Sequence, residues 1–429
     1  MTRNRLKAKF SGLNVYFKKN LIIMGFLGFS SGLPLLLTMS TLTWWLGKVG
    51  IDKKTIGLFA LVGLPYSWKF LWAPFIDRIK LPLLSRYFGR RRSWLLVVQG
   101  LLMAAIIGMG TINPVENLYG LAVLSLIVAF WSATQDIIID AYRIQLLKKE
   151  EFAAGAAMEV NFYRLGMMIA GAGALTLSDY MSWDMVYMIM ALFMLVGMIT
   201  TFFAPPTAHD TTPTSHNFLE WVTTTVVDPF RDFTQKSGWG YALLFVMLYK
   251  LGDVMMGPMA TIFYQEIGFT GTEVGTVTKL FGIPMTILGS FLIGGFAYKW
   301  GLLRTLLVTG LLHACSNGMF LVLANVGHSI PVLYAAIALE NISNGMAIAA
   351  FVAFLSTYCS PAFAATQYAL LSSLVAQTRT ISWAFSGWVA DALSNWTAFF
   401  SLAIVLGFPS LLLLIYFIKS DCLKMERQA

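Results

Sequence analysis

The chain has 429 residues, of which 57% are hydrophobic and only 12% are charged, and its mean hydropathy is +0.70. Soluble globular proteins carry about 25% charged residues, so this composition excludes that class and indicates a polytopic membrane protein. The net charge of +9 does not indicate nucleic-acid binding, because the basic residues lie in short clusters between apolar runs. Three cysteines and four scattered histidines predict neither a disulfide framework nor a metal site.

Apolar runs long enough to cross a bilayer organise the chain. A spanning helix needs about 20 residues, and twelve such runs occur, near 20–46, 55–76, 93–111, 119–146, 153–178, 184–204, 240–265, 272–298, 302–323, 331–357, 365–390 and 396–418. The longest polar segment divides them into two groups of six. We therefore predict an all-α membrane protein with a basic N-terminal segment 1–19, a six-helix bundle 20–204, a central loop 205–239, a second six-helix bundle 240–418 and a tail 419–429.

The positions of lysine and arginine predict the orientation. With a cytoplasmic N-terminus, only three loop cations, Lys48, Lys53 and Lys54, face outward, and the other loop cations face the cytoplasm. The positive-inside rule therefore places both termini, the central loop and the tail in the cytoplasm.

The two groups of spans resemble each other, which predicts a pseudo-symmetric pair of bundles. Phe152-Ala153-Ala154 recurs as Phe363-Ala364-Ala365, and Gly32-Leu33-Pro34 has a looser echo in Gly257-Pro258. Glycine and proline inside a span, such as Gly32 and Pro34, either permit the bending that alternating access requires or allow close helix packing.

Ten charged residues fall inside the predicted spans. A charge at bilayer depth costs roughly 2.5–3.5 kcal/mol and normally faces a bundle interior or a water-filled path. The basic ones are Lys69, Arg164, Lys250, Lys279 and Arg379, and the acidic ones are Asp136, Asp140, Glu159, Asp253 and Glu340. The equal numbers predict ion pairs, because an unpaired buried charge is far more costly than a hydrogen-bonded pair.

One span carries a polar stripe. Ser132, Asp136 and Asp140 are spaced by four residues, so they share a helix face, and Arg143 follows them. A carboxylate is a natural proton carrier, because burial favours its protonated form and an approaching cation favours its charged form. Asp136 is therefore our first candidate for proton coupling. Asp140 is either a second candidate or a structural partner of Arg143.

Two further proton-coupling candidates, Asp253 and Glu340, lie in the second half of the chain. Asp253 follows Lys250 by three residues on one helix. These two residues therefore either form an intrahelical ion pair or take part in coupling.

The loop after the second span carries a cluster of charges. It reads Pro74-Phe75-Ile76-Asp77-Arg78 and, after an insertion, Gly89-Arg90-Arg91-Arg92. This pattern resembles the signature of the major facilitator superfamily, in which such clusters brace the cytoplasmic ends of the bundle. The alternative is that these cations are simple membrane anchors. The resemblance implies gating or conformational roles for Asp77, Arg78, Gly89, Arg90 and Arg91.

Longer stretches narrow the resemblance. Several of them place charge inside the membrane, including Lys69-Phe70-Leu71-Trp72-Ala73-Pro74, Ser132-Ala133-Thr134-Gln135-Asp136-Ile137, Tyr163-Arg164-Leu165-Gly166-Met167, Tyr249-Lys250-Leu251-Gly252-Asp253 and Glu340-Asn341. Together with Phe29-Ser30-Ser31-Gly32-Leu33-Pro34-Leu35, they are similar to the AmpG muropeptide permeases across all twelve spans. The resemblance implies proton-driven import of GlcNAc-anhydroMurNAc, with or without peptide, for cell-wall recycling. Where the organism has an inducible β-lactamase, it also implies delivery of the inducing signal.

The implied substrate needs cations for its carboxylates, and hydrogen-bonding groups and flat apolar faces for its sugars. The residues that meet these needs are the cations Lys69, Arg164, Lys250 and Arg379, the polar Gln135, Asn341, Asn344 and Gln377, and the aromatic Trp44, Tyr66, Tyr163 and Tyr249. Any single aromatic residue is otherwise an interface anchor or a packing residue. Glu159 is assigned to the same pocket, although it and Asn161 depart from the smaller or less charged residues expected in relatives.

These patterns predict a proton-coupled symporter of the bacterial inner membrane that works by rocking its two bundles. Its partners would be the anhydromuropeptide, protons and the phospholipid bilayer. We expect a monomer, because the bundle can satisfy its own polar groups. We also expect no enzymatic activity and no cofactor, metal or nucleic acid, with the proton gradient as the driving force. Two other interpretations stay open: a membrane sensor that binds cell-wall fragments without net transport, and a translocator of lipids or acyl carriers.

Overall fold

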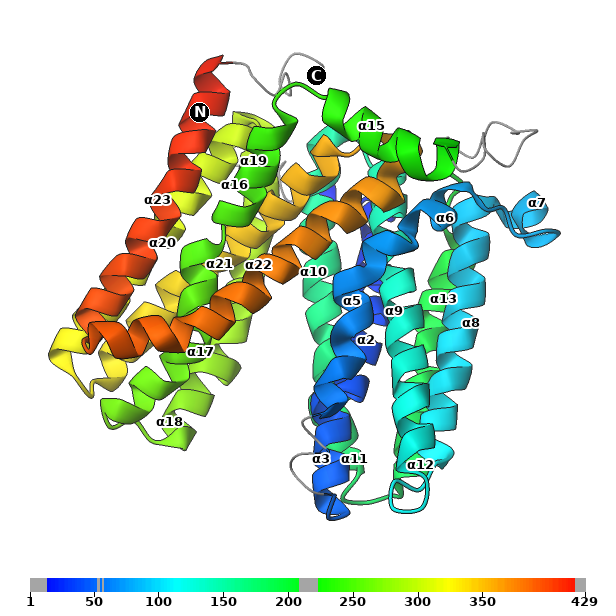
Figure 1. Ribbon diagram of the computed structural model, residues 1–429, viewed down its shortest axis with the longest axis horizontal. Helices are drawn as coiled ribbons and strands as arrows, with labels where there is room; N and C mark the ends of the chain where they lie inside the picture. The colour runs from blue at the N-terminus through cyan, green and yellow to red at the C-terminus, as the bar shows by residue number, and fades with distance from the viewer. Residues whose placement is uncertain (1–13, 52–54, 56–57, 208–222, 421–429) are drawn as a thin grey trace, which may run out of the picture.

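The computed structural model describes residues 14–51, 55, 58–207 and 223–420, and every regular element in these ranges is helical (Figure 1). The helices form two bundles that lie side by side, one from each half of the chain. This arrangement confirms the predicted all-α, two-bundle architecture. The predicted segments 1–19, 205–239 and 419–429 lie partly outside the described residues.

The N-terminal bundle begins with a long helix and ends before the central loop. Its elements are η1 (Asn14–Phe17), α2 (Lys19–Thr38), α3 (Ser40–Lys48), η2 (Phe59–Gly63), α5 (Leu64–Trp68), η3 (Lys69–Leu71), α6 (Ala73–Arg78), α7 (Leu84–Phe88), α8 (Arg90–Thr111), α9 (Leu118–Leu146), η4 (Lys149–Glu151), α10 (Phe152–Met168), η5 (Ile169–Gly173), α11 (Ala174–Leu177), α12 (Trp183–Leu192) and α13 (Met194–Phe203).

The C-terminal bundle follows the central loop. Its elements are η6 (Thr223–Val227), α15 (Asp228–Gln235), α16 (Trp239–Leu248), α17 (Leu251–Glu266), α18 (Gly271–Gly275), η7 (Thr276–Phe281), α19 (Gly282–Trp300), α20 (Leu302–Val326), α21 (Ile330–Tyr358), η8 (Pro361–Phe363), α22 (Ala364–Leu393) and α23 (Trp396–Ser420). Gly89 and Gly301 precede α8 and α20 with φ of 75° and 77°, a conformation that glycine adopts without steric cost. The third span of each half therefore begins with the same backbone conformation.

Nine helices among the described residues are long and apolar enough to cross a membrane. The other three predicted spans are the second, which Pro65 and Pro74 divide into short turns, and those formed by α10 and α22. All three lie against the opposite bundle: α22 packs on α5, η3 and α6, and α10 packs on α19 and α21. A helix that faces protein needs less apolar surface than one that faces lipid, and α10, with 17 residues, is also short for a span.

Close backbone packing joins α2 to α10. A Cβ atom on Gly28 would meet the backbone of Glu159, and one on Gly32 would meet the backbone of Tyr163. The helix α2 runs without a break through Gly32 and Pro34. In this conformation, therefore, Gly32 serves close helix packing.

Substitution of Gly32 by alanine is expected to destabilise the protein, because overpacking of a tight interface costs about 1–3 kcal/mol and the backbone it would meet cannot rotate away. The measurement is the thermal unfolding midpoint of the detergent-purified protein. Gly100→Ala in α8 is the matched control, since a Cβ there would meet nothing within 4 Å. Equal midpoints for the two variants would contradict this account of Gly32.

The two bundles meet at one end of the molecule, which we call the terminal face; it carries α15, the turn between α6 and α8, and the end of α23 (Figure 1). At the opposite end, the far face, which carries α3 and α18, the bundles splay apart. Hydrogen bonds between the halves lie toward the terminal face, including that from Tyr16 Oη to the Phe291 carbonyl oxygen (2.7 Å) and that from Gln145 Nε2 to the Pro361 carbonyl oxygen (2.7 Å).

Candidate functional site

The polar stripe of α9 holds two carboxylates in different environments. Asp136 accepts a hydrogen bond from Ser31 Oγ of α2 and has no ion-pair partner among the described residues. Asp140, one turn nearer to the terminal face, lies 2.9 Å from Arg143 Nη2 and 3.7 Å from Lys69 Nζ. The chain therefore neutralises Asp140 with two cations and leaves Asp136 with a neutral partner.

Arg143 connects the two halves. Its Nη1 atom donates to Glu159 Oε2 of α10 at 2.5 Å, and its Nε donates to Ser356 Oγ of α21 at 3.3 Å. Its guanidinium also lies 4.9 Å from the ring centroid of Tyr368 on α22. Glu159, which was predicted to line the substrate pocket, thus neutralises a buried guanidinium in this conformation. Lys69, predicted to bind substrate, is likewise paired.

Polar side chains lie near Asp136. Both amide atoms of Gln135 have no hydrogen-bond partner in the described part of the chain. Tyr66 lies beside Ser132 and Thr38 and within electrostatic reach of Asp136, and Tyr163 of α10 lies within electrostatic reach of Asp136 and Tyr66. We call Tyr66, Ser132, Gln135, Asp136 and Tyr163 the N-half polar cluster. Because buried polar groups are nearly always hydrogen-bonded to protein, water or ligand, the Gln135 amide is suited to bind water or a polar ligand.

A second group of charges lies in the C-terminal bundle. Lys250 Nζ donates to Asn344 Oδ1 at 2.6 Å and to Asp253 Oδ2 at 3.2 Å, so the intrahelical ion pair is present. Asn344 Nδ2 donates to Glu340 Oε1 at 3.3 Å. His313 Nε2 lies 3.3 Å from Asp253 Oδ1. We call Lys250, Asp253, His313, Glu340 and Asn344 the C-half charged cluster.

Arg164 of α10 links this cluster to the other half. It interacts electrostatically with Glu340, and its half-buried side chain leaves Nη1 without a hydrogen-bond partner among the described residues. A half-buried guanidinium with a vacant donor is suited to bind a carboxylate.

A cavity of about 500 Å³ adjoins the C-half charged cluster. Asp253, Glu340 and Asn341 contribute its polar wall, and Tyr264 and Phe269 contribute aromatic surface. Its size lies in the range of roughly 300–1,000 Å³ that is usual for small-molecule sites. Asn341 is held in place by Thr286 Oγ1, which donates to its Oδ1 at 2.6 Å.

Four of the predicted substrate residues are not members of these clusters. Tyr249 is buried in the C-terminal bundle, where its ring stacks on Phe351 with centroids 5.1 Å apart. Trp44 is 57% exposed on α3 at the far face. Gln377 and Arg379 are exposed on α22, and Arg379 lies within electrostatic reach of Tyr163.

Sequence reasoning missed Ser31 and His313. Ser31 lay inside a stretch that matched the family, and its position beside Gly32 at the contact with α10 could have indicated a buried hydroxyl. The sequence carried no signal for His313, because its partners come from other helices.

The predicted gating residues gather at the terminal face. Asp77, which is 1% exposed, accepts from Arg91 Nη2 (2.5 Å), Thr366 N (2.8 Å), Thr366 Oγ1 (2.8 Å) and Ala365 N (3.3 Å). Arg90 donates to the Asp77 carbonyl oxygen. Because Thr366 and Ala365 begin α22, the carboxylate caps a helix of the opposite bundle, where the helix dipole favours negative charge. We call this contact the Asp77 latch.

The neighbouring cation extends the same contact. Arg78 Nη2 donates to the Thr224 carbonyl oxygen at 2.7 Å, and its guanidinium lies 5.2 Å from the Phe363 ring centroid. Gly89 forms the turn before α8, whereas Gly32 and Pro34 lie in α2 and are not part of this group.

The end of the central loop is also tied to the C-terminal bundle. Lys236 Nζ donates to the Tyr358 carbonyl oxygen (2.6 Å) and to Gln367 Oε1 (2.8 Å). Burial lowers the pKa of this ammonium from its usual value, an effect that the nearby Asp232 carboxylate partly opposes. The loop therefore fixes the turn between α21 and α22 beside the Asp77 latch.

Comparison with known proteins places this fold and site in context. Residues 20–185 match the family model described as Acetyl-coenzyme A transporter 1. The chain is 40% identical over 406 residues to the anhydromuropeptide permease of Escherichia coli (strain K12), covering 94% of this chain and 80% of that protein. It is 34% identical over 395 residues to the putative transporter AmpG 4 of Rickettsia conorii, covering 91% of this chain and 94% of that protein.

Solved structures share the fold at low sequence identity. The proton:xylose symporter XylE of the major facilitator superfamily superposes with a TM-score of 0.67 at 11% identity, covering 93% of this chain and 95% of that one. The human organic anion transporter MFSD10 (TETRAN) superposes with a TM-score of 0.64 at 16% identity, covering 94% and 98%. The predicted twelve-helix major facilitator fold is therefore confirmed.

Proposed function

The chain belongs to the AmpG anhydromuropeptide permease family of the major facilitator superfamily, and on that premise we propose that it is a proton-coupled symporter of anhydromuropeptides. Its cargo is GlcNAc-anhydroMurNAc with or without stem peptide, moved from the periplasm to the cytoplasm across the bacterial inner membrane. The imported fragments feed peptidoglycan recycling, and in a cell with an inducible β-lactamase they also supply the inducing signal.

The environment of Asp136 is the observation that carries proton coupling. This carboxylate lies in a membrane span, accepts from the neutral Ser31 hydroxyl, and lies within electrostatic reach of Tyr66 and Tyr163. The nearest cation, Lys69, pairs with Asp140 one turn away and also acts electrostatically on Asp136. Loss of a proton from Asp136 would create a charge that Lys69 can move to neutralise. Such an exchange of partners converts a protonation into a movement of the second span against α9.

The positive-inside rule supports an orientation with the terminal face in the cytoplasm. In that orientation the Asp77 latch joins the two bundles on the cytoplasmic side, and the ends of the bundles that splay apart face the periplasm (Figure 1). We place the substrate with its carboxylates at Arg164 and its sugars at the N-half polar cluster.

Uptake of labelled GlcNAc-anhydroMurNAc into right-side-out vesicles, with the membrane potential clamped at zero, tests this function. A difference of one pH unit, acid outside, is worth about 1.4 kcal/mol per proton, which sustains a tenfold concentration ratio for each coupled proton. We expect at least tenfold accumulation together with stoichiometric proton entry. Collapse of the pH gradient should reduce the ratio to about one.

The same assay separates the alternatives. A sensor without net transport would bind equal amounts of muropeptide with or without the pH gradient and would not accumulate it. A translocator of lipids or acyl carriers would move its cargo unaffected by excess soluble muropeptide. Either result would contradict the proposed symport.

A further inference from the structure

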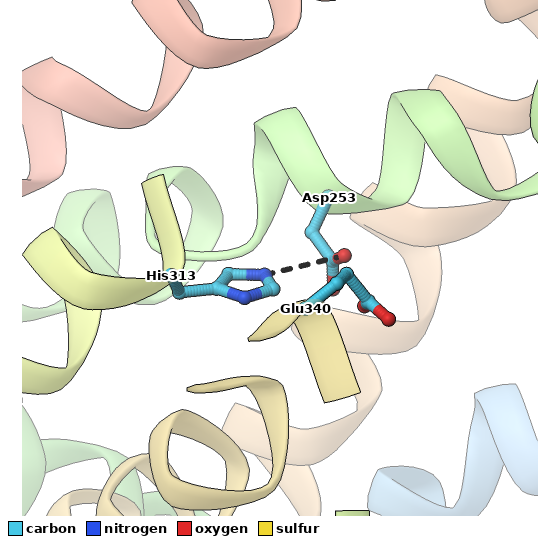
Figure 2. A group of neighbouring side chains, drawn as sticks. All are labelled: Asp253, His313 and Glu340. Atoms are coloured by element: carbon cyan, nitrogen blue, oxygen red, sulfur yellow. Dashed lines mark ion pairs between the residues drawn. The ribbon is translucent and has the colours of Figure 1, made fainter. Parts of the chain in front are cut away.

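Three titratable side chains from three different helices meet in the C-terminal bundle. The His313 ring of α20 faces Asp253 of α17, and Glu340 of α21 lies beside them, so that one nitrogen or oxygen atom of each residue lies within 4.8 Å of the others (Figure 2). The ion pair drawn in Figure 2 joins His313 Nε2 to Asp253 Oδ1 at 3.3 Å. His313 is 7% exposed, so its ring is enclosed by protein.

The partners of His313 differ at its two ring nitrogens. Nε2 faces Asp253 Oδ1 at 3.3 Å, and because a carboxylate only accepts, the neutral ring carries its hydrogen on Nε2. Nδ1 is then the acceptor, 3.2 Å from Ser343 Oγ. The Ser343 hydroxyl also reaches the Leu339 carbonyl oxygen at 2.7 Å, so it can donate there and accept from Nδ1–H once a second proton binds the ring.

The charges around the His313 imidazole sum to zero while the imidazole is neutral. Asp253 and Lys250 approach from α17 and the turn before it, and Glu340 approaches from α21. Tyr249, at the end of α16, and Ser410 of α23 line the adjoining space but add no charge. Arg164 of the opposite bundle balances Glu340. With a neutral imidazole the two carboxylates match the two cations. A substrate carboxylate at Arg164 adds one negative charge, which one proton on His313 would compensate.

A small cavity borders this ring, and the larger cavity borders its carboxylate neighbours. The cavity of about 500 Å³ reaches Asp253 and Glu340 from the side of Tyr264 and Phe269. A separate cavity of about 20 Å³ is lined by His313, Asp253 and Asn317, and Asn317 Oδ1 has no hydrogen-bond partner within the described ranges. A space of this size with several polar groups is sufficient for one water molecule, which needs about 10–15 Å³.

Asp253, His313 and Glu340 are less suited to bind a metal ion than to bind a proton. Aspartate, histidine and glutamate are common metal ligands. Here, however, the Lys250 ammonium lies 3.2 Å from Asp253 Oδ2 and 2.6 Å from Asn344 Oδ1. A second cation at the same carboxylate would meet electrostatic repulsion from that ammonium.

We propose that His313 is a second proton-binding residue of the transport cycle, which takes up a proton at Nδ1 beside Ser343 when a substrate carboxylate binds at Arg164. The proton comes from water in the small cavity that His313 lines, converts the imidazole to an imidazolium paired with Asp253, and leaves again as the substrate is released. The inference rests on the proposed symport and adds to it a proton site that is separate from Asp136.

His313→Gln tests the inference, with His328→Gln as the matched control. His328 lies near the far face, where its Nε2 is 3.2 Å from Glu273 and its side chain is 43% exposed. Protons and labelled GlcNAc-anhydroMurNAc entering the vesicles are counted together, and proton uptake on substrate binding is measured on the purified protein. We expect His313→Gln to take up one proton fewer per substrate and to accumulate tenfold less at one unit of pH difference. Substrate exchange without a gradient should persist, and His328→Gln should match the unaltered protein.

Each other outcome has a defined meaning. An unchanged proton count in His313→Gln overturns the inference while leaving symport intact. Absence of gradient-driven accumulation in the unaltered protein overturns the proposed function itself. If a chelator abolishes uptake and Zn²⁺ restores it only when His313 is present, the cluster binds a metal ion and the inference of a proton site is overturned.

If His313→Gln fails to fold, Ser343→Ala takes its place, because it keeps the imidazole ring. We expect the pH midpoint of substrate-induced proton uptake to move by about 0.7 unit, which corresponds to the free energy of one hydrogen bond. An unmoved midpoint in that variant overturns the inference.

Discussion

Asp136→Asn is expected to lower proton-driven accumulation of GlcNAc-anhydroMurNAc at least tenfold at one unit of pH difference, because each coupled proton sustains about a tenfold ratio. The amide keeps the size of the carboxyl group and can still accept from Ser31, so the packing of α2 against α9 should survive. It cannot bind or release a proton. The measurement is vesicle uptake with and without the gradient, together with exchange of labelled for unlabelled substrate at equal pH. Exchange should persist, since it needs no net proton movement.

Two aspartate variants serve as controls for Asp136→Asn. Asp179→Asn changes a carboxylate that is 69% exposed and pairs with Lys48 at 3.6 Å, and it should behave as the unaltered protein does. Asp140→Asn removes the ion-pair partner of Lys69 and one of the two carboxylates that pair with Arg143, and it should lower the yield of folded protein, because a buried charge without its partner is strongly destabilising. Full accumulation by Asp136→Asn would show that the proton is carried elsewhere.

Asp77→Ala is expected to weaken the contact between the two bundles at the terminal face. The carboxylate is the shared acceptor of Arg91 and of the first turn of α22, and its removal leaves a 1% exposed guanidinium without its charge partner. Breaking a buried pair in this way costs roughly 3–5 kcal/mol. Because the latch joins the two bundles, we expect much of that cost to destabilise the conformation that is closed at this face. A destabilisation of that size changes the ratio between the conformations closed and open at the terminal face more than a hundredfold.

Spin labels on the two sides of the latch measure this shift. Suitable sites are the exposed Tyr87 in α7 and Ala362 in η8, in a chain whose three native cysteines are replaced by serine. We expect a longer distance to dominate in Asp77→Ala and a smaller change in Asp77→Asn, which keeps an acceptor without the charge. Glu150→Ala alters an exposed acid before α10 and should leave the distance unchanged. An unaltered distance in Asp77→Ala would mean that the latch does not hold this conformation.

Arg143 connects the surroundings of Asp136 with the interface between the two bundles. It pairs with Asp140 on the α9 stripe and reaches Ser356 and Tyr368 in the other half. Any movement that opens the terminal face must break these contacts, and any change in the charge of Asp136 acts on the Lys69 and Asp140 pair beside them. The stripe and the interface between the bundles are therefore parts of one network.

The sequence by itself determined the membrane class, the two groups of spans, the polar face of α9 and the charge cluster after the second span. Each of these depends on local hydropathy or on residue spacing along one helix, which can be read without knowing the neighbours. Of the ten charges predicted to pair, Lys69 lies with Asp140 and Lys250 with Asp253, whereas Asp136 has no ion-pair partner among the described residues and the Lys279 side chain lies outside them.

Only the tertiary structure decided which charges pair. Lys69 lies with Asp140, Glu159 with Arg143, and His313 with Asp253, while Asp136 keeps a neutral partner. These choices depend on the rotation and depth of each helix relative to the others, which close backbone contacts such as that of α2 with α10 hold in place. Residues far apart in the chain set that geometry, and hydropathy carries no record of it.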